Sequence, residues 1–336
     1  MPHTLPRARL ATLLSAAPRH RVAIVGDAML DVYLRGDVDR ISPEAPVPVV
    51  RVRDRRYALG GAANVAQNVA ALGARCELVA AVGADPAGDQ LRQMLHAIGA
   101  DPRGLVPVGR PTTTKTRLLA RAQQVIRFDE EEDSDLTGSE VSAVLAAVDR
   151  AVDAADAVVI EDYNKGVLTA AVIARAIARA HERAVPVVVD PKYRNFFAYR
   201  GATIFKPNRR ELESALGAAV DLDAADTLPA LLQQLGVEHL LLTLGERGMA
   251  VLSPGGAVDR IPTTAREVYD VVGAGDTVTA YLAMMLAAGA TVREAAVIAN
   301  YAAGVEVGKL GAATVTADEL LEAYDQHVAD LLSAPG

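Results

Sequence analysis

Short apolar runs alternate with longer amphipathic segments along most of the chain. The apolar runs are strand-length and rich in valine and isoleucine, and they cover residues 21–26, 75–83, 157–160, 187–190, 202–205 and 239–244. The intervening segments carry apolar residues at helical spacing and cover residues 60–73, 85–99, 139–154, 169–183, 292–308 and 316–332. A strand–helix alternation of this kind predicts one α/β domain built on a mostly parallel sheet, with helices covering the sheet.

Two segments break this alternation. Residues 32–53 and 112–129 read as pairs of extended strands, and the first contains Pro43, Pro46 and Pro48, which exclude a helix. We therefore expect a single domain over residues 1–336, with both segments inserted as strands of a small β lid. Residues 7–17 faintly resemble a signal peptide, but their apolar part is short and interrupted, so we expect a short helix packed on the domain.

Composition narrows the function classes. The chain has 336 residues, a net charge of −8 and a pI near 5.3, which argues against a broad nucleic-acid-binding surface. No apolar run reaches the length of a membrane span. Cys76 is the only cysteine, which excludes an internal disulfide and fits a reducing, cytoplasmic location. We expect a cytoplasmic protein that binds neither nucleic acid nor membrane.

The most informative stretch is residues 270–277, Asp-Val-Val-Gly-Ala-Gly-Asp-Thr, directly before an apolar helical pattern over 278–286. Gly273, Ala274 and Gly275 leave the backbone accessible at a helix N-terminus, where free N–H groups and the helix dipole attract an anion such as phosphate. Asp276 follows in the first turn, where it either caps the helix or accepts a proton from a hydroxyl that attacks the phosphate. The glycines beside it favour phosphoryl transfer.

Other polar residues follow predicted strands, where ligands of α/β sheets bind. Asp27 and Asp31 come after the first strand; the sequence leaves Asp27 open between a turn carboxylate and a ligand. Gly60 and Gly61 open the next helix and allow close backbone approach, and Asn64 offers both donors and acceptors to a sugar hydroxyl.

Basic residues of the lid form a second candidate site. Lys115 and Arg117 alternate on a predicted strand, and a bound phosphomonoester would explain cations clustered in an acidic protein. For Arg121 and Arg127 we favour a solvated charged face.

Two further groups lie at predicted strand ends. The run Glu-Asp-Tyr-Asn-Lys-Gly over 161–166 bunches charges at the site rim and contains Asp162 and Lys165. Asn208 and Glu211 lie three apart at a helix start, which suits a capping pair and also suits an oxygen-liganded Mg²⁺; the two roles are compatible.

Two of these motifs carry a resemblance. Gly-Gly-Ala-Ala-Asn at 60–64 and the stretch 270–280 resemble the N- and C-terminal signatures of the ribokinase-like (PfkB) carbohydrate kinases, and the resemblance runs from about residue 21 to 316. It implies a three-layer α/β/α fold with a β lid, and ATP and Mg²⁺ as cofactors, with a monovalent cation as a further candidate. No Gly-x-x-x-x-Gly-Lys-Ser/Thr or Gly-x-Gly-x-x-Gly motif occurs, so a P-loop and a dehydrogenase site are not expected.

The resemblance also implies residue roles. Asp276 would be the catalytic base and residues 273–275 the anion hole, while Asp31, Gly60, Gly61 and Asn64 would bind the sugar. Asp162 and Lys165 would border the substrate, Asn208 and Glu211 would order Mg²⁺ through water, and the nucleotide side would include Lys192, Asn208, Thr243, Gly245 and Asn300. Without the resemblance, Lys192 would read as a surface lysine.

Within that family, Ser-Pro-Glu-Ala-Pro-Val-Pro at 42–48 and Thr-Lys-x-Arg at 114–117 are similar to the D-glycero-β-D-manno-heptose-7-phosphate kinases of lipopolysaccharide heptose synthesis. This similarity implies phosphorylation of the anomeric hydroxyl to the 1,7-bisphosphate and a homodimer formed through the lid. Some relatives carry a fused nucleotidyltransferase; no His-x-Gly-His motif occurs here, so we expect the kinase alone. Two alternatives stay open: a kinase of another sugar, such as fructose, ribose or a hexose phosphate, and a non-catalytic sugar- or nucleotide-binding regulator.

Overall fold

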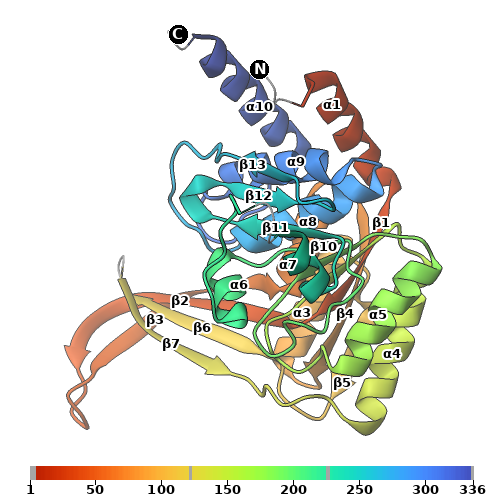
Figure 1. Cartoon of the computed structure of the whole chain (residues 1–336). Helices are drawn as coiled ribbons and strands as arrows, with labels where there is room; N and C mark the ends of the chain where they lie inside the picture. The colour runs from red at the N-terminus through yellow and green to blue at the C-terminus, as the bar shows by residue number, and fades with distance from the viewer. Residues whose placement is uncertain (1–4, 121–122, 225–227, 334–336) are drawn as a thin grey trace.

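The computed structural model describes residues 5–120, 123–224 and 228–333 (Figure 1). Within these ranges the strands form a nine-stranded sheet and a separate four-stranded sheet. Helices cover the large sheet, and the small sheet projects from it as an arm (Figure 1). The expected three-layer α/β fold with a β lid is confirmed.

The large sheet has the strand order β13-β12-β11-β10-β9-β8-β1-β4-β5. All neighbouring pairs from β11 to β5 are parallel, whereas β12 pairs antiparallel with both β11 and β13. The strands are β1 Arg21–Gly26, β4 Arg75–Gly83, β5 Leu105–Val108, β8 Ala157–Glu161, β9 Val187–Asp190, β10 Ile204–Phe205, β11 His239–Thr243, β12 Met249–Leu252 and β13 Val258–Ile261.

Side-chain alternation along the strands produces the two outer layers. In β1, Val22 and Ile24 belong to one apolar cluster, whereas Ala23 and Val25 belong to the other, as expected for a strand buried on both faces. The first cluster includes residues of α1 Arg7–Ala16, α2 Ala62–Ala71, α3 Pro86–Ala97, α8 Ala274–Ala287, α9 Val292–Glu306 and α10 Ala317–Ser333. The second includes residues of α4 Gly138–Asp153, α5 Ala170–Glu182, α6 Arg209–Leu216 and α7 Leu228–Leu235.

The lid sheet has the order β3-β2-β6-β7, with β2 Ala28–Ile41, β3 Pro48–Gly61, β6 Thr114–Ala120 and β7 Gln123–Glu130. Its first two strands are longer than the predicted 32–53. Only Asp27 separates β1 from β2, and β3 runs directly into α2. The lid is therefore continuous in backbone with the carboxyl edge of the large sheet.

Several predicted boundaries shift. Helix α8 begins at Ala274 with Gly273 as its N-cap, so Asp276 lies in the first turn as expected and the apolar pattern over 278–286 follows it. The predicted strand 202–205 is reduced to Ile204–Phe205, and α7 was not predicted. Residues 7–16 form the expected packed helix, which buries three leucines and pairs Arg7 with Asp325 of α10. Arg121 lies outside the described residues.

No helix within the described ranges combines the length and apolarity needed to cross a membrane.

Because β1 lies so close to β8 at Gly26, we expect that no larger residue is tolerated at this position. A Cβ at this residue would lie 2.1 Å from the Glu161 carbonyl oxygen, so Gly26→Ala forces the two strands apart. We expect it to lower the free energy of unfolding by about 3 kcal/mol in urea denaturation, the upper range for overpacking. Gly109→Ala is the control, because its nearest atom would be 3.8 Å away, and it should stay within about 1 kcal/mol of wild type. Equal stability of both variants would contradict the packing described here.

Candidate active site

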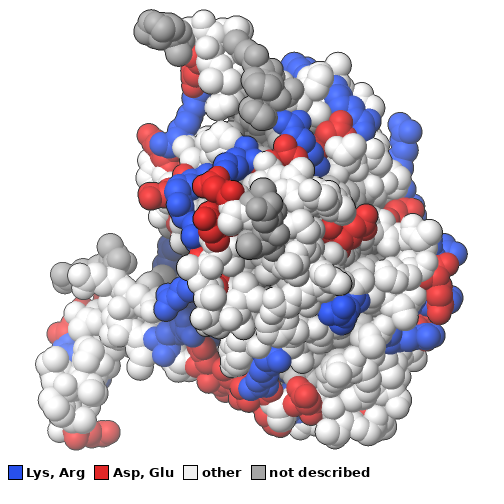
Figure 2. Space-filling model, in the orientation of Figure 1, with Lys and Arg blue, Asp and Glu red and all other residues white. Residues whose placement is uncertain are grey.

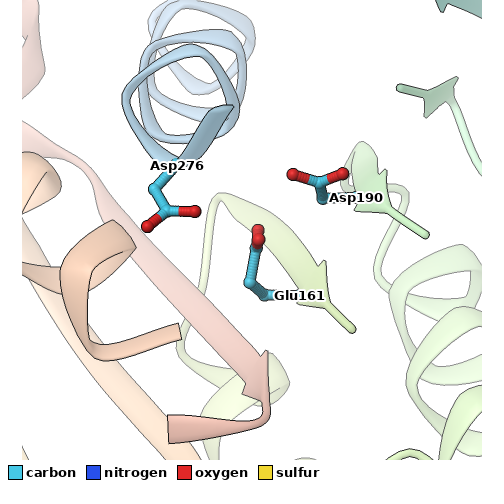
Figure 3. A group of neighbouring side chains, drawn as sticks. All are labelled: Glu161, Asp190 and Asp276. Atoms are coloured by element: carbon cyan, nitrogen blue, oxygen red, sulfur yellow. The ribbon is translucent and has the colours of Figure 1, made fainter. Parts of the chain in front are cut away.

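Three carboxylates converge at the carboxyl edge of the large sheet (Figure 3). Glu161 ends β8, Asp190 ends the adjacent β9, and the two are register partners. Asp276 reaches them from the first turn of α8. Each side chain offers an oxygen within 4.8 Å of those of the other two. Of the three, only Asp276 was among the predicted site residues, although Glu161 directly follows a predicted strand and Asp190 ends one.

Asp276 is buried and held by two donors from distant parts of the chain. Asn64 Nδ2 donates to Oδ2 over 2.7 Å, and the Tyr163 hydroxyl donates to Oδ1 over 2.8 Å. Burial raises the pKa of Asp276 to about 6, although these two hydrogen bonds act in the opposite direction. The structure thus gives this carboxyl a higher basicity than an exposed aspartate while keeping it ionised at neutral pH.

The other two carboxylates differ in how they are compensated. Lys206, itself buried, donates from Nζ to Asp190 Oδ2 over 2.7 Å. Glu161 is 0% exposed, and neither of its side-chain oxygens has a hydrogen-bond partner in the described structure. Burial raises the pKa of Glu161 well above its ordinary value, and the negative charges of Asp190 and Asp276 raise it further. Lys206 and Glu161 were not assigned roles from the sequence.

The N-terminus of α8 lies where the sequence predicts an anion cradle, and anion binding by residues 273–275 stays a prediction; of these, the Ala274 N–H faces the Val271 carbonyl oxygen at 3.5 Å. Gly273 caps the helix with a φ of 98°, a left-handed conformation that favours glycine. In the described structure the N–H groups of Gly275 and Asp276 have no backbone or side-chain acceptor. A Cβ on Gly275 would lie 3.7 Å from Asp190 Oδ2 and 3.8 Å from Lys206 Nζ, so the cradle opens directly onto the carboxylate cluster.

A cavity of about 540 Å³ adjoins the cradle. Its walls bring together Asn208, Thr243, Gly245 and Asn300, four of the five residues predicted on the nucleotide side, with Ala274 and Gly275 of the cradle. Apolar side chains complete the lining, among them Val268, Val271, Val278 and Val307. The fifth residue, Lys192, lines a neighbouring cavity that shares Asn208 with the first.

Asn208 and Glu211 form the capping pair that the sequence indicated. Asn208 Oδ1 accepts from the Glu211 N–H over 2.8 Å, and Glu211 Oε2 accepts from the Asn208 N–H over 2.9 Å. The other Glu211 oxygen accepts from Lys192 Nζ over 2.5 Å. The cap is confirmed, and the ordering of Mg²⁺ through water stays a prediction.

On the lid side, Asp31 forms an ion pair with Arg117. Asp31 also faces Lys115 in the register of β2 with β6. A Cβ at Gly60 would lie 2.6 Å from Asp31 Oδ2, so the glycine is required for the carboxylate to sit here. Arg127 pairs with Asp129 and is half exposed, which agrees with the solvated face expected for it.

Tyr163 connects the lid to the carboxylate cluster, and sequence reasoning missed it. Lys115 Nζ and Lys192 Nζ lie 5.6 and 5.5 Å from the centre of its ring, while its hydroxyl donates to Asp276. Burial lowers the pKa of Lys115. Lys165 is turned to Glu131, with 2.8 Å between Nζ and Oε1.

Asp27 and Asp162 hold the loop that presents Tyr163. Asp27 accepts from the backbone N–H groups of Tyr163, Lys165 and Val167 over 2.8, 2.9 and 3.2 Å, which identifies it as a loop-structuring carboxylate. Asp162 accepts from the Asn164 N–H and the Tyr199 hydroxyl over 2.7 and 2.6 Å. Direct contact of Asp162 with substrate stays a prediction, since both its oxygens already have donors.

This arrangement agrees with a comparison to protein families. Residues 19–319 match the pfkB family carbohydrate kinases, and this match includes the lid, the cradle and the carboxylate cluster. The chain belongs to the pfkB family of carbohydrate kinases. Membership makes it a phosphotransferase with an alcohol-group acceptor, and the family implies ATP as phosphoryl donor.

Relatives with curated names are similar over nearly the whole chain. It is 47% identical over 315 residues to the Bifunctional protein HldE of Shewanella amazonensis, and 44% identical over 327 residues to that of Rhodospirillum rubrum. The alignments include 94% and 96% of this chain. They span 65% and 66% of the length of those proteins.

Solved structures support the fold of the family. Arabidopsis thaliana ribokinase complexed with ribose and ATP superposes with a TM-score of 0.70 at 20% identity, covering 91% of this chain and 98% of that one. The tetrameric inhibited form of Escherichia coli phosphofructokinase-2 gives 0.74 at 16% identity, covering 92% and 99%.

The surroundings of Asp276 predict its titration. Its pKa of about 6 lies above the ordinary 3.8, so its neutral form stabilises the fold below about pH 4, and this contribution is lost as the pH rises through about 6. Tyr163→Phe removes a donor to the carboxylate and should raise the pKa further. Both pKa values are measured by following the side-chain carbonyl resonances of ¹³C-labelled aspartate as the pH changes. Because the pKa of buried Asp27 is also raised to about 6, the Asp276→Asn variant is needed to identify the Asp276 resonance.

Tyr199→Phe is the matched control, since its hydroxyl bonds Asp162 instead of Asp276. An Asp276 pKa near 4, or one that moves equally in the two tyrosine variants, would contradict the site geometry.

Proposed function

We propose that the chain transfers the γ-phosphoryl group of ATP to the anomeric hydroxyl of D-glycero-β-D-manno-heptose 7-phosphate, giving the 1,7-bisphosphate. The observation that carries the kinase chemistry is Asp276, a buried carboxylate at the mouth of a backbone anion cradle between a nucleotide-sized cavity and the lid. The choice of sugar rests on the similarity of segments 42–48 and 114–117 to heptose-7-phosphate kinases and on the relatives named HldE.

Asp276 acts as the general base in this proposal. The anomeric O–H bond breaks as its oxygen bonds to the γ-phosphorus, the proton passes to the Asp276 carboxylate, and the bond from phosphorus to the β-phosphate oxygen breaks to release ADP. A pKa of about 6 suits a base that accepts its proton late, as a loose phosphoryl-transfer transition state requires. Asn64 and Tyr163 keep the carboxylate oriented toward the acceptor.

The cradle supplies the electrostatic part of the reaction. The free N–H groups of Gly275 and Asp276 point where negative charge gathers on the transferred phosphoryl group. The N-terminal end of the α8 dipole adds to this effect. Because the donors are fixed in the first turn of a long helix, little reorganisation is needed during transfer.

The nucleotide would occupy the 540 Å³ cavity, with its phosphates toward the cradle. Thr243, Gly245 and Asn300 would contact the nucleoside, and Lys192 would approach the phosphates from the neighbouring cavity. Asn208 and Glu211 offer the oxygen ligands that suit Mg²⁺ with its waters, although their present hydrogen bonds favour indirect contact. When bound, Mg²⁺ would neutralise phosphate charge. A monovalent cation stays a prediction.

On the other side, Asp31, Asn64 and the backbone of Gly60 and Gly61 would hold the sugar hydroxyls. Lys115 is the best candidate for the substrate's 7-phosphate, because Arg117 already pairs with Asp31 and Lys165 with Glu131.

The lid would close over the sugar and form a homodimer contact. It exposes large apolar side chains on three of its strands and on the β2–β3 connection: Ile41, Val47, Val52, Tyr57, Val125, Ile126 and Phe128. The lid face seen in Figure 2 is mainly uncharged, whereas both signs are interspersed on the body. These exposed apolar side chains are available for a contact with a second copy of the chain. A cytoplasmic location stays a prediction.

The substrate assignment is tested by ADP release with Mg-ATP on heptose 7-phosphate, sedoheptulose 7-phosphate, fructose, fructose 6-phosphate and ribose, followed by phosphorus NMR. We expect a new anomeric phosphate only with the aldoheptose phosphate. Turnover on another sugar would contradict the heptose assignment, and sugar binding without ADP release would contradict the kinase proposal.

In the same assay, Asp276→Asn should reduce kcat by about 10²–10⁴-fold, the usual contribution of a general base. Near-normal turnover of the folded variant would remove Asp276 from that role.

The proposed phosphate contact predicts a selective effect of Lys115→Ala. Loss of one charged hydrogen bond, about 1.5–3 kcal/mol, should raise KM for the sugar phosphate roughly 10–100-fold and leave KM for ATP unchanged. Arg127→Ala, which removes a paired and half-exposed cation from the neighbouring strand, is the control and should leave both constants unchanged. Equal effects of the two variants on the sugar-phosphate KM would contradict the assignment.

A further inference from the structure

Glu161 is the most unusual side chain of the carboxylate cluster. It is completely buried, and both of its oxygens lack a hydrogen-bond partner in the described structure. In Figure 3 it points between Asp190 and Asp276. A buried carboxylate without donors is costly, and proteins commonly compensate such a group with a partner charge or a metal ion. Glu161 therefore needs compensation by a bound proton or by a cation, and the two carboxylates that face it offer further ligands for a cation.

We propose that Glu161, Asp190 and Asp276 bind a divalent cation directly, at a site distinct from Asn208 and Glu211. Their oxygens lie within 4.8 Å of one another, and this is the one group of three such residues in the described chain able to hold a metal. Hard cations such as Mg²⁺ and Mn²⁺ prefer oxygen ligands at about 2.1 Å, which places neighbouring ligands about 3–4 Å apart. Small side-chain rotations bring the three carboxylates to that spacing.

The charges of the cluster match such an ion. Metal binding releases the proton of Glu161, and the three ionised carboxylates with the Lys206 ammonium then sum to −2, which a divalent cation neutralises. Lys206 occupies Asp190 Oδ2 and leaves Oδ1 available. The two Asp276 oxygens each accept one hydrogen bond, and a carboxylate oxygen has a second lone pair for a metal. Lys206 therefore orients Asp190 as a ligand, but its single positive charge does not neutralise the three carboxylates.

The position of the ion gives it a role in phosphoryl transfer. A Cβ added to Gly275 would lie 3.7 Å from Asp190 Oδ2 and 3.8 Å from Lys206 Nζ, so the cluster lies at the base of the cradle. A cation there would meet an oxygen of the phosphoryl group held by the cradle. This last step rests on the proposed kinase reaction, whereas binding of the cation rests on the carboxylates alone.

The test uses Mn²⁺ as the probe, without nucleotide or sugar, and electron paramagnetic resonance to measure free Mn²⁺. We expect one bound Mn²⁺ per chain in the wild type and at least tenfold weaker binding in Glu161→Gln. Glu306→Gln is the matched control, because Glu306 is also fully buried with unpartnered oxygens but belongs to no group of three ligands in the described chain. It should bind Mn²⁺ like the wild type. Glu211→Gln is measured beside it, because loss confined to that variant would locate the ion at the Asn208–Glu211 pair instead.

Thermal unfolding gives a second readout that does not depend on activity. Mn²⁺ should raise the Tm of the wild type but not that of Glu161→Gln. If Glu161→Gln fails to fold, Asp190→Asn takes its place. Absence of Mn²⁺ binding by the wild type, equal binding by Glu161→Gln, or loss only in Glu211→Gln would overturn the proposal. Kinase activity on any sugar leaves this result unaffected, so the two proposals fail separately.

Discussion

The burial of Asp276 under the first turn of α8 is the constraint on which the site depends. Burial raises the pKa of the Asp276 carboxyl. Hydrogen bonds from Asn64 and Tyr163 act in the opposite direction and keep it ionised at neutral pH. These donors come from α2 and from the loop after β8, which lie far from Asp276 in sequence. The start of α8, the segment of α2 that contains Asn64 and the Tyr163 loop must therefore fold together before the surroundings of Asp276 are complete.

The parallel sheet makes this convergence possible. Neighbouring strands β8 and β9 end side by side, which sets Glu161 against Asp190, and Gly26 allows β1 to approach β8 closely. Asp27 then ties the Tyr163 loop to the point where the lid begins. Asp27 therefore joins the first residues of the lid to the loop whose Tyr163 hydroxyl donates to Asp276.

Sequence reasoning recovered the layers and the lid, because periodicity and proline content each have a local physical cause. The structure also brings together residues that the family resemblance implied: Asn64 donates to Asp276, and Asn208, Thr243 and Gly245 line one cavity. It missed Tyr163, Glu161, Asp190 and Lys206 as functional residues. These residues come together because their strands are neighbours in the sheet. The sequence contains several apolar runs that end in a charged residue, and it does not show which of them lie side by side. For the same reason the sequence could not decide whether Asp27 is a turn carboxylate or a ligand.

The central claim is that the α8 cradle and Asp276 form a phosphoryl-transfer centre. The most direct measurement is a crystal structure with ADP, Mg²⁺, aluminium fluoride and heptose 7-phosphate. Our account predicts the fluoride mimic of the phosphoryl group within hydrogen-bonding distance of the Gly275 and Asp276 N–H groups, in line between ADP and an anomeric oxygen that contacts the Asp276 carboxylate. A mimic bound away from the cradle, or an acceptor oxygen remote from Asp276, would contradict it.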